Sequence, residues 1–179
     1  MSVPDHFALF GLEPRFALDP DALDAAYKRV QDKVHPDRFA AATPAERRIA
    51  MQWAARANEA LQTLRSPVRR AAYLCEINGV ALGAESNTAM PPAFLMQQLE
   101  WRESLADAAA AADPRALEAL AQETDSARAA LLDQLAGAID TDRDFLRASA
   151  LVRQMMFVDK MRDEIDHACH AQVAPSSAG

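Results

Sequence analysis

Apolar residues recur at helical spacing along most of the chain, and prolines stand where the helices would begin. Asp19-Pro20 is typical of an N-cap followed by proline at the first helical position. Apolar side chains then follow at spacings of four, three and four residues, at Leu23, Tyr27, Val30 and Val34. A proline disfavours helical geometry in the residue before it, so Pro36 predicts that this helix ends near Val34 or His35.

The same signals predict further helices and no strands. Thr43-Pro44, with Glu46 three residues after the threonine, forms a capping-box pattern that opens a second long helix. Its expected apolar line is Ile49, Trp53, Ala57, Ala60, Leu61 and Leu64. Ser66-Pro67 opens a shorter helix. The remaining expected helices cover residues 7–10, about 92–112, 114–137 and 141–171. The pattern as a whole predicts an all-α fold.

The helices fall into two groups. Residues 80–91, with the sequence VALGAESNTAMP, lack periodicity and contain turn-forming residues, so we expect a linker there. Residues 1–79 are expected to form a helical hairpin with short flanking helices, and residues 92–171 an antiparallel three-helix bundle. Residues 172–179 are expected to be a disordered tail.

Composition and charge narrow the class of function. Half of the residues are hydrophobic, yet only 5 are glycine, which favours helices over a β-sandwich. Residues 1–84 carry 11 Lys and Arg against 10 Asp and Glu, whereas residues 85–179 carry 8 against 16. This distribution argues against nucleic-acid binding and suits two different protein partners.

Nothing in the sequence predicts export or a membrane span. The opening MSVPDHFALFGL has no basic region and too short an apolar run for a signal peptide. No apolar segment reaches the length of a transmembrane helix. Cys75 and Cys169 do not form a CxxC pair. We therefore expect a cytoplasmic protein with reduced thiols and no membrane contact.

The loop after the first long helix begins with His35-Pro36-Asp37, which fits a plain connector, a catalytic pair or a docking tip. A catalytic pair is disfavoured because a rigid proline separates the two groups. No Ser or Cys nucleophile motif and no Gly-rich phosphate loop accompanies them. Asp37 on a rigid loop can make a charge-assisted hydrogen bond to a basic side chain of a partner, which favours docking.

The surroundings of this tripeptide resemble the J-domain family of heat-shock co-chaperones. The matching segments are LFGL, AAYKRVQDKVHPDRF and ANEALQTLRSPVRRAAYL, all within residues 5–75. The resemblance implies that the His-Pro-Asp loop stimulates ATP hydrolysis by a seventy-kilodalton heat-shock-type chaperone. The residues that it implies for chaperone binding are His35, Pro36, Asp37, Tyr27, Lys28, Arg29, Lys33 and Arg38. Asp32 interrupts the basic face that these residues form.

The helix expected at 92–112 has more apolar surface than one core face requires. On a helical wheel, an ordinary core stripe within about 60° contains Phe94, Trp101, Leu105 and Ala108. A separate arc contains Leu95, Met96, Leu99, Glu100 and Glu103. Either the neighbouring helices cover this second arc, or it is an exposed protein-binding surface with an acidic rim.

The last expected helix also has more apolar surface than one core face requires. Its segment LVRQMMFVDKM, residues 151–161, is apolar on several sides. Phe157 and Met161 share one side, distinct from the side of Leu151 and Val158. Methionine-rich surfaces suit adaptable binding, although methionine is also a flexible core filler.

The J-domain-like segment followed by FLMQQLEWRESL and FVDKM is similar to the HscB-type family of co-chaperones of iron–sulfur cluster assembly, over residues 5–170. The resemblance implies binding to an IscU-like cluster scaffold through Leu95, Met96, Leu99, Glu100, Glu103 and Phe157. It also implies that the J-domain recruits an HscA-like chaperone, stimulates its ATPase and so promotes cluster transfer. We expect no cofactor and no enzymatic activity.

Leu74-Cys75 stands where many J-domains have an acidic residue, which predicts that the fourth helix packs against the second group of helices. A rival function is that of a general J-protein, which would deliver unfolded clients. A weaker rival is a helical enzyme or metal binder that uses His35 or His167, with Cys169 and His170 nearby. We expect no metal there, because no fourth ligand is evident.

Overall fold

A computed structural model of the chain describes residues 5–35, 43–83 and 90–173, and every regular element in these ranges is helical. The elements are α1 (His6–Phe10), α2 (Pro20–Val34), α3 (Pro44–Arg65), α4 (Pro67–Ile77), α5 (Pro92–Ala110), α6 (Pro114–Ala136), η3 (Gly137–Thr141) and α7 (Phe145–Val173). η3 is a turn of π-helix. The all-α prediction is confirmed. None of the described helices is long and apolar enough to cross a membrane.

α2 and α3 begin where the local capping chemistry predicts. The Asp19 carboxylate accepts a hydrogen bond from the backbone N–H of Asp21 at 3.0 Å, with Pro20 at the first helical position. Thr43 and Glu46 form the reciprocal capping box, in which the Thr43 N–H donates to the Glu46 carboxylate at 2.8 Å. These bonds satisfy backbone groups that a helix leaves unpaired at its start, so short sequence motifs determine the boundaries.

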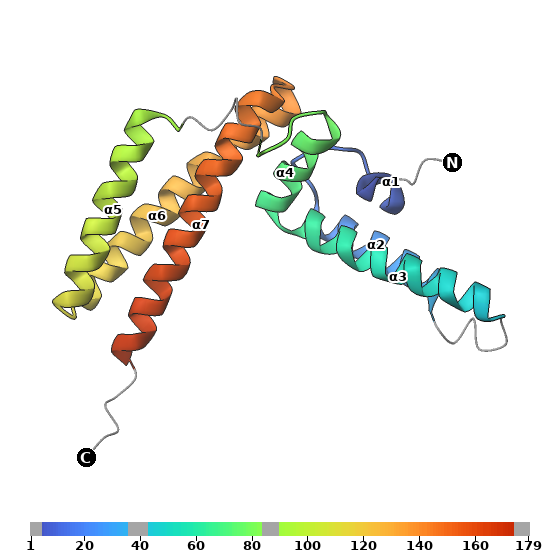
Figure 1. Ribbon diagram of the computed structural model, residues 1–179, viewed down its shortest axis with the longest axis horizontal. Coiled ribbons are helices and arrows are strands. Elements are labelled where there is room, and N and C mark those ends of the chain that lie inside the picture. The colour runs from blue at the N-terminus through green and yellow to red at the C-terminus, as the bar shows by residue number, and fades with distance from the viewer. Residues whose placement is uncertain (1–4, 36–42, 84–89, 174–179) are drawn as a thin grey trace, which may run out of the picture.

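α2 and α3 run antiparallel and form the hairpin that points to the right in Figure 1. The Tyr27 hydroxyl donates to Asn58 Oδ1 at 2.6 Å, and Arg65 pairs with Asp24 at 2.5 Å, so polar contacts join the two helices at two levels. α1 packs across the hairpin near α4 and buries its two aromatic rings, Phe7 and Phe10.

α5, α6 and α7 form the three-helix bundle on the left of Figure 1. Trp101 and Ala108 of α5 are buried, as the core stripe predicts. Thr124 of α6 is fully buried and donates its hydroxyl to the carbonyl of Leu120 at 2.9 Å, so this polar group keeps a hydrogen bond inside the bundle.

The start of the last helix was predicted wrongly. It was expected at about Thr141, but α7 begins at Phe145, because α6, which ends at Ala136, continues into the π-helical turn η3. Arg143 then adopts a left-handed conformation with φ 56°, and the Asp144 carboxylate accepts from the N–H of Arg147 at 2.9 Å. Helical periodicity does not distinguish a π-turn from an ordinary turn, so the sequence pattern missed the element.

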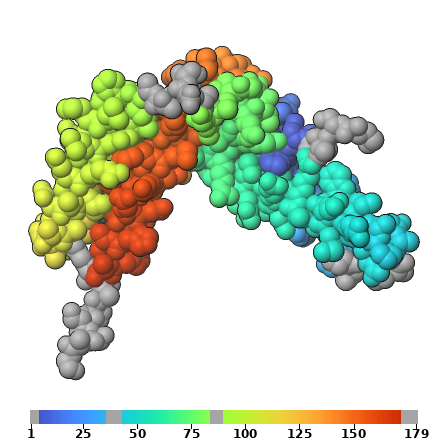
Figure 2. All heavy atoms as spheres, in the orientation of Figure 1, coloured from blue at the N-terminus to red at the C-terminus, as the bar shows by residue number. Residues whose placement is uncertain are grey.

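The hairpin and the bundle meet at a shared apolar junction. Leu74 and Cys75 of α4 are buried at the packing of α4 against α7, which confirms that the fourth helix contacts the second group. The Cys75 thiol lies 3.7 Å from the carbonyl oxygen of Phe145, and burial raises the pKa of this thiol to about 11. Cys75 is therefore a packing residue. Figures 1 and 2 show the hairpin and the bundle diverging from this junction.

Part of the expected linker packs against this junction. The Val80 N–H donates to the carbonyl of Cys75 at 2.9 Å, and Arg153 of α7 donates to the carbonyl of half-buried Leu82 at 3.5 Å. The expected linker also includes residues 84–89, and the expected tail includes 174–179; both lie outside the described residues.

Candidate protein-binding surfaces

The exposed side of α2 is basic. Lys28, Arg29 and Lys33 are exposed, whereas Val30 and Val34 on the other side of the helix are half-buried. Lysine and arginine side chains on a rigid helix can attract an acidic partner over several ångströms at low salt. The arrangement can therefore steer association with a negatively charged protein.

His35 is exposed at the C-terminal end of α2, with an extended backbone (φ −60°, ψ 134°). This conformation is the one that a following proline favours, so the local sequence accounts for the end of the helix. Pro36, Asp37 and Arg38, which complete the predicted chaperone-binding loop, lie outside the described residues.

Tyr27 is placed differently from the basic residues with which it was grouped. It is half-buried, with its ring edge-on to Phe10 at 6.3 Å between centroids. Its hydroxyl donates to Asn58 and accepts from Gln31. Most of the contacts of this side chain therefore lie within the hairpin.

The outer side of α3 carries an apolar surface that the sequence pattern placed in the core. Ile49 and Trp53 were expected on the buried line, but Trp53 is 36% exposed and Ile49 is more exposed still. The reason is that α1, with only five residues, covers the part of α3 that contains Ala57, Ala60 and Leu64 and leaves the earlier turns open. A single amphipathic stripe does not reveal how far the covering helix extends.

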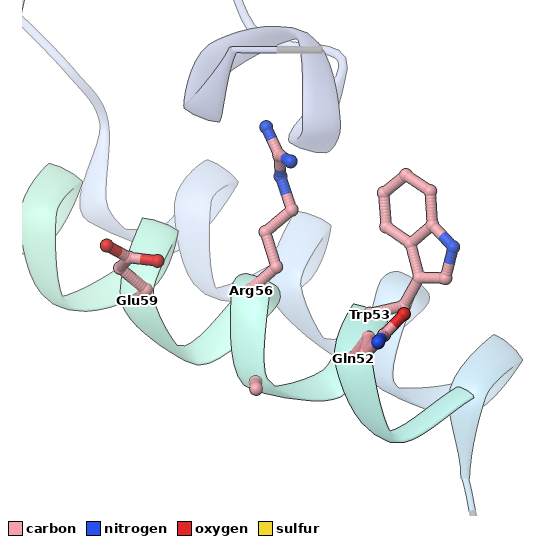
Figure 3. A pocket seen from close by; sticks show the side chains of 5 residues that line it. Gln52, Trp53, Arg56 and Glu59 are labelled. Carbon is pink, nitrogen blue, oxygen red and sulfur yellow. The ribbon is translucent and has the colours of Figure 1, made fainter. Parts of the chain in front are cut away.

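Trp53 forms one wall of an open hollow of about 520 Å³ beside α1. The hollow is also lined by Gln52, Arg56 and Glu59, and the Arg56 guanidinium lies 6.0 Å from the centroid of the Trp53 ring. Figure 3 shows Arg56 projecting from α3 toward the short α1 ribbon. The site joins an aromatic face with one positive and one negative side chain, and sequence reasoning missed it.

The second apolar arc of α5 is exposed. Leu95 is 49% exposed, Met96 is 63% exposed and Leu99 is 57% exposed. Glu100 and Glu103 are exposed on the same side of the helix. We call these five residues the α5 face. The alternative that neighbouring helices cover the arc is therefore wrong, because α6 and α7 pack only on the opposite side of α5.

Contacts on the opposite side of α5 hold the α5 face in place. The Trp101 indole N–H donates to the Glu123 carboxylate of α6 at 2.8 Å, and Gln97 donates to the same carboxylate oxygen at 3.0 Å. Phe94 packs edge-on against Trp101, with 6.4 Å between ring centroids. These contacts fix the rotation of α5 about its axis, so the exposed leucines are presented from a rigid support.

Phe157 of α7 lies at the seam between α5 and α7. It is half-buried, its ring is edge-on to Phe94 at 6.0 Å, and the Arg102 guanidinium lies 5.5 Å from its centroid. Met161, which shares its side on the wheel, is buried. The surplus of apolar residues on α7 is thus mostly core, because α7 contacts α4, α5 and α6 on different sides.

The histidines near the end of α7 bond within their own helix. His167 Nδ1 lies 2.6 Å from the carbonyl oxygen of Asp163, and His170 Nδ1 lies 2.6 Å from that of Asp166. Over the described part of the chain, no three His, Cys, Asp or Glu residues come together in a way that could hold a metal ion.

Comparison with known proteins agrees with this architecture. Residues 90–166 match the family described as the HSCB C-terminal oligomerisation domain. The chain is 57% identical to the co-chaperone protein HscB homolog of Burkholderia multivorans over 160 residues, covering 89% of this chain and 91% of that one. It is 55% identical to the homolog of Bordetella pertussis over 168 residues, covering 94% and 98% of the two chains. The chain belongs to the HscB family of co-chaperones.

The fold is that of a solved member of the same family. The structure of chaperone HscB from Vibrio cholerae superposes with a TM-score of 0.81 at 35% identity, covering 94% of this chain and 99% of that one. The hairpin with its flanking helices is therefore the family's J-domain, and α5–α7 form its C-terminal bundle. Co-chaperones act on other proteins without catalysing a reaction themselves, so the chain is not an enzyme.

Proposed function

We propose that this chain is a co-chaperone of iron–sulfur cluster assembly. It would bind an IscU-like scaffold through its bundle and deliver that scaffold to an HscA-like chaperone. Through the J-domain it would stimulate the ATPase of that chaperone and promote cluster transfer. The observation that carries the proposal is the α5 face, an apolar surface on a rigid helix whose opposite side is buried.

The α5 face has the chemistry of a specific protein interface. Leu95, Met96 and Leu99 supply apolar area at its centre, and Glu100 and Glu103 form an acidic rim. Phe157 adds an aromatic ring at the seam with α7. A rigid support lowers the ordering cost of binding, which favours one folded partner over many flexible peptides.

Residues of the J-domain would make the contacts with the chaperone. Lys28, Arg29, Lys33 and Arg38 would steer the chaperone, and His35, Pro36 and Asp37 would make the contact that triggers hydrolysis. Tyr27 would contribute mainly by holding α2 against α3. We assign residues 1–79 to the chaperone-stimulating unit, 80–91 to the connection, and 92–171 to the scaffold-binding unit.

The test measures partner selectivity directly. Purified scaffold is titrated by calorimetry into the full-length chain, and a set of unfolded apolar peptides is titrated in parallel. The proposal expects saturable one-to-one binding to the folded scaffold and no measurable binding to the peptides. Comparable binding to the peptides would instead favour the general J-protein, and absence of scaffold binding would refute the proposal.

A further inference from the structure

The side chain of Asp140 joins the J-domain to the bundle through two hydrogen bonds. The Asp140 carboxylate, in the π-helical turn η3, accepts a hydrogen bond from the backbone N–H of Phe16 at 2.6 Å. Its second oxygen accepts from the backbone N–H of Ala17 at 2.8 Å. The bonded groups are more than 120 residues apart in sequence. A carboxylate that accepts two N–H groups is held in both position and orientation.

The surroundings of Asp140 restrict its movement further. Phe16 is buried in the segment between α1 and α2, and the Arg70 guanidinium of α4 lies 5.1 Å from its ring centroid. Arg70 also donates to the carbonyl of Leu64 at 2.7 Å. Burial lowers the pKa of Arg70, and the negative charge of Asp140 partly opposes this shift. Three segments therefore meet at one charged and aromatic cluster.

The π-helical turn is what places Asp140 at this point. The Asp142 N–H donates to the carbonyl of Gly137 at 2.9 Å, and the Asp144 N–H donates to that of Ala138 at 2.8 Å. Ala138 and Ile139 are buried against the core, and Asp140, the next residue, faces the segment at residues 16–17. Turns of π-helix are frequent at functional positions, where they re-aim a side chain.

The other contacts that the structure describes between the J-domain and the bundle are less specific. Leu74 and Cys75 of α4 pack on α7 through apolar surface, and the Cys75 thiol to Phe145 carbonyl contact is long, at 3.7 Å. The Arg153 bond to the carbonyl of Leu82 is also long, at 3.5 Å. Apolar packing resists separation but tolerates small changes of angle. The two bonds to Asp140 are shorter and directional, so they oppose such changes.

We propose that Asp140 is a positioning residue that fixes the angle between the chaperone-binding hairpin and the scaffold-binding α5 face. The role rests on the proposed function, since it matters when both partners are held at once. A fixed angle keeps a bound scaffold at a high effective concentration beside a chaperone docked on the hairpin. Loss of Asp140 is expected to leave binding of the scaffold alone and of the chaperone alone unchanged. It is expected to weaken the stimulation of the chaperone when both partners are present.

The first arm of the test needs no partner. The full chain carries Cys169→Ser, and spin labels are attached at Ala25→Cys on α2 and Ala106→Cys on α5, both exposed positions. Asp140→Asn, whose amide group offers only one acceptor atom, is expected to broaden the distance distribution between the labels. The matched control is Asp142→Asn, which removes the same charge from an exposed neighbour paired with Arg147 and is expected to leave the distribution unchanged.

The second arm compares assays with one partner against an assay with both partners present. With Asp140→Asn, the scaffold's Kd and the ATPase stimulation by the co-chaperone alone are expected to stay the same. The joint stimulation by co-chaperone and scaffold, at sub-saturating scaffold, is expected to fall about fivefold. Asp140→Glu keeps the carboxylate and is expected to restore part of both the distance distribution and the joint stimulation. It replaces the Asn variant if a thermal melt shows that variant to be unfolded at the assay temperature.

The outcomes separate this inference from the proposed function. An unchanged distance distribution, or equal broadening in Asp142→Asn, would overturn the positioning role. So would unchanged joint stimulation, or an equal loss in the single-partner assays, since the latter indicates general damage. If the scaffold does not bind at all, the proposed function fails, and the distance measurement alone decides whether Asp140 fixes the angle.

Discussion

Replacing Leu95 and Leu99 together by alanine tests the α5 face most directly. Both side chains are about half exposed, at 49% and 57%, and lie one helical turn apart. If the α5 face is a binding surface, the double variant is expected to keep its fold and lose affinity for the scaffold. If these leucines stabilise the bundle instead, the fold itself should fail.

The exposed fractions set the size of the stability effect. Full burial of a leucine side chain contributes about 1.5–3 kcal/mol, and truncation of a buried one costs about 2–5 kcal/mol because a cavity is left. At half exposure there is no enclosed cavity, and about half of the transfer contribution remains. We therefore expect a loss of about 0.75–1.5 kcal/mol of unfolding free energy per site. A truncation of Leu117, which is fully buried in α6, provides the core reference.

The double variant should also bind the scaffold more weakly. Central apolar anchors of an interface commonly cost about 2 kcal/mol or more on truncation, and about 1.4 kcal/mol corresponds to a factor of ten. The scaffold's Kd is expected to rise at least about tenfold for the double variant. ATPase stimulation without scaffold is expected to stay unchanged, because it uses the hairpin.

The assay pairs a denaturant unfolding curve with a calorimetric scaffold titration on the same preparation. Leu146→Ala is the matched control, because Leu146 is a leucine of α7 that is 64% exposed and lies outside the α5 face. It is expected to cost no more stability than either α5 leucine and to leave the scaffold's Kd unchanged. Three results would refute the reasoning: a collapsed unfolding curve for the double variant, an unchanged Kd with an intact fold, or an equal loss of affinity in Leu146→Ala.

Three further predictions concern the J-domain. Asp37→Asn is expected to abolish ATPase stimulation in single-turnover hydrolysis while scaffold affinity stays the same, and normal stimulation would contradict the proposed role of the loop. Association with the chaperone, followed by stopped flow, is expected to slow as the salt concentration rises, because Lys28, Arg29 and Lys33 are exposed. An association rate that does not depend on salt would contradict their role in steering the chaperone. Burial lowers the pKa of His6, so the unfolded chain binds the proton more readily, and stability is expected to fall as pH drops below about 6.5. The free energy of unfolding in urea, measured at pH 7.5 and 5.5, should differ less between the two pH values in His6→Phe than in the unsubstituted chain. An equal difference would show that His6 does not cause the pH dependence.

Most helix boundaries were predictable from sequence because caps act over three or four residues. Asp19, Thr43 and Ser66 each satisfy backbone groups in the helix that they precede, whatever the rest of the chain does. The same locality explains the end of α2 before Pro36. The second apolar arc of α5 was visible on a wheel for a similar reason, since residue spacing alone defines the faces of a helix.

Tertiary structure decided whether each apolar face is covered. Leu95 and Met161 both belonged to a surplus stripe, yet the first is exposed and the second is buried, because α7 has neighbours on several sides and α5 does not. Trp53 was placed in the core by its spacing and is partly exposed, because α1 is too short to reach it. Asp140 gave no signal in the sequence, since its two partners lie more than 120 residues away and are backbone N–H groups that any residue but proline presents. Local chemistry determined where the helices of this chain begin, and only the packing of distant segments determined which side chains they present.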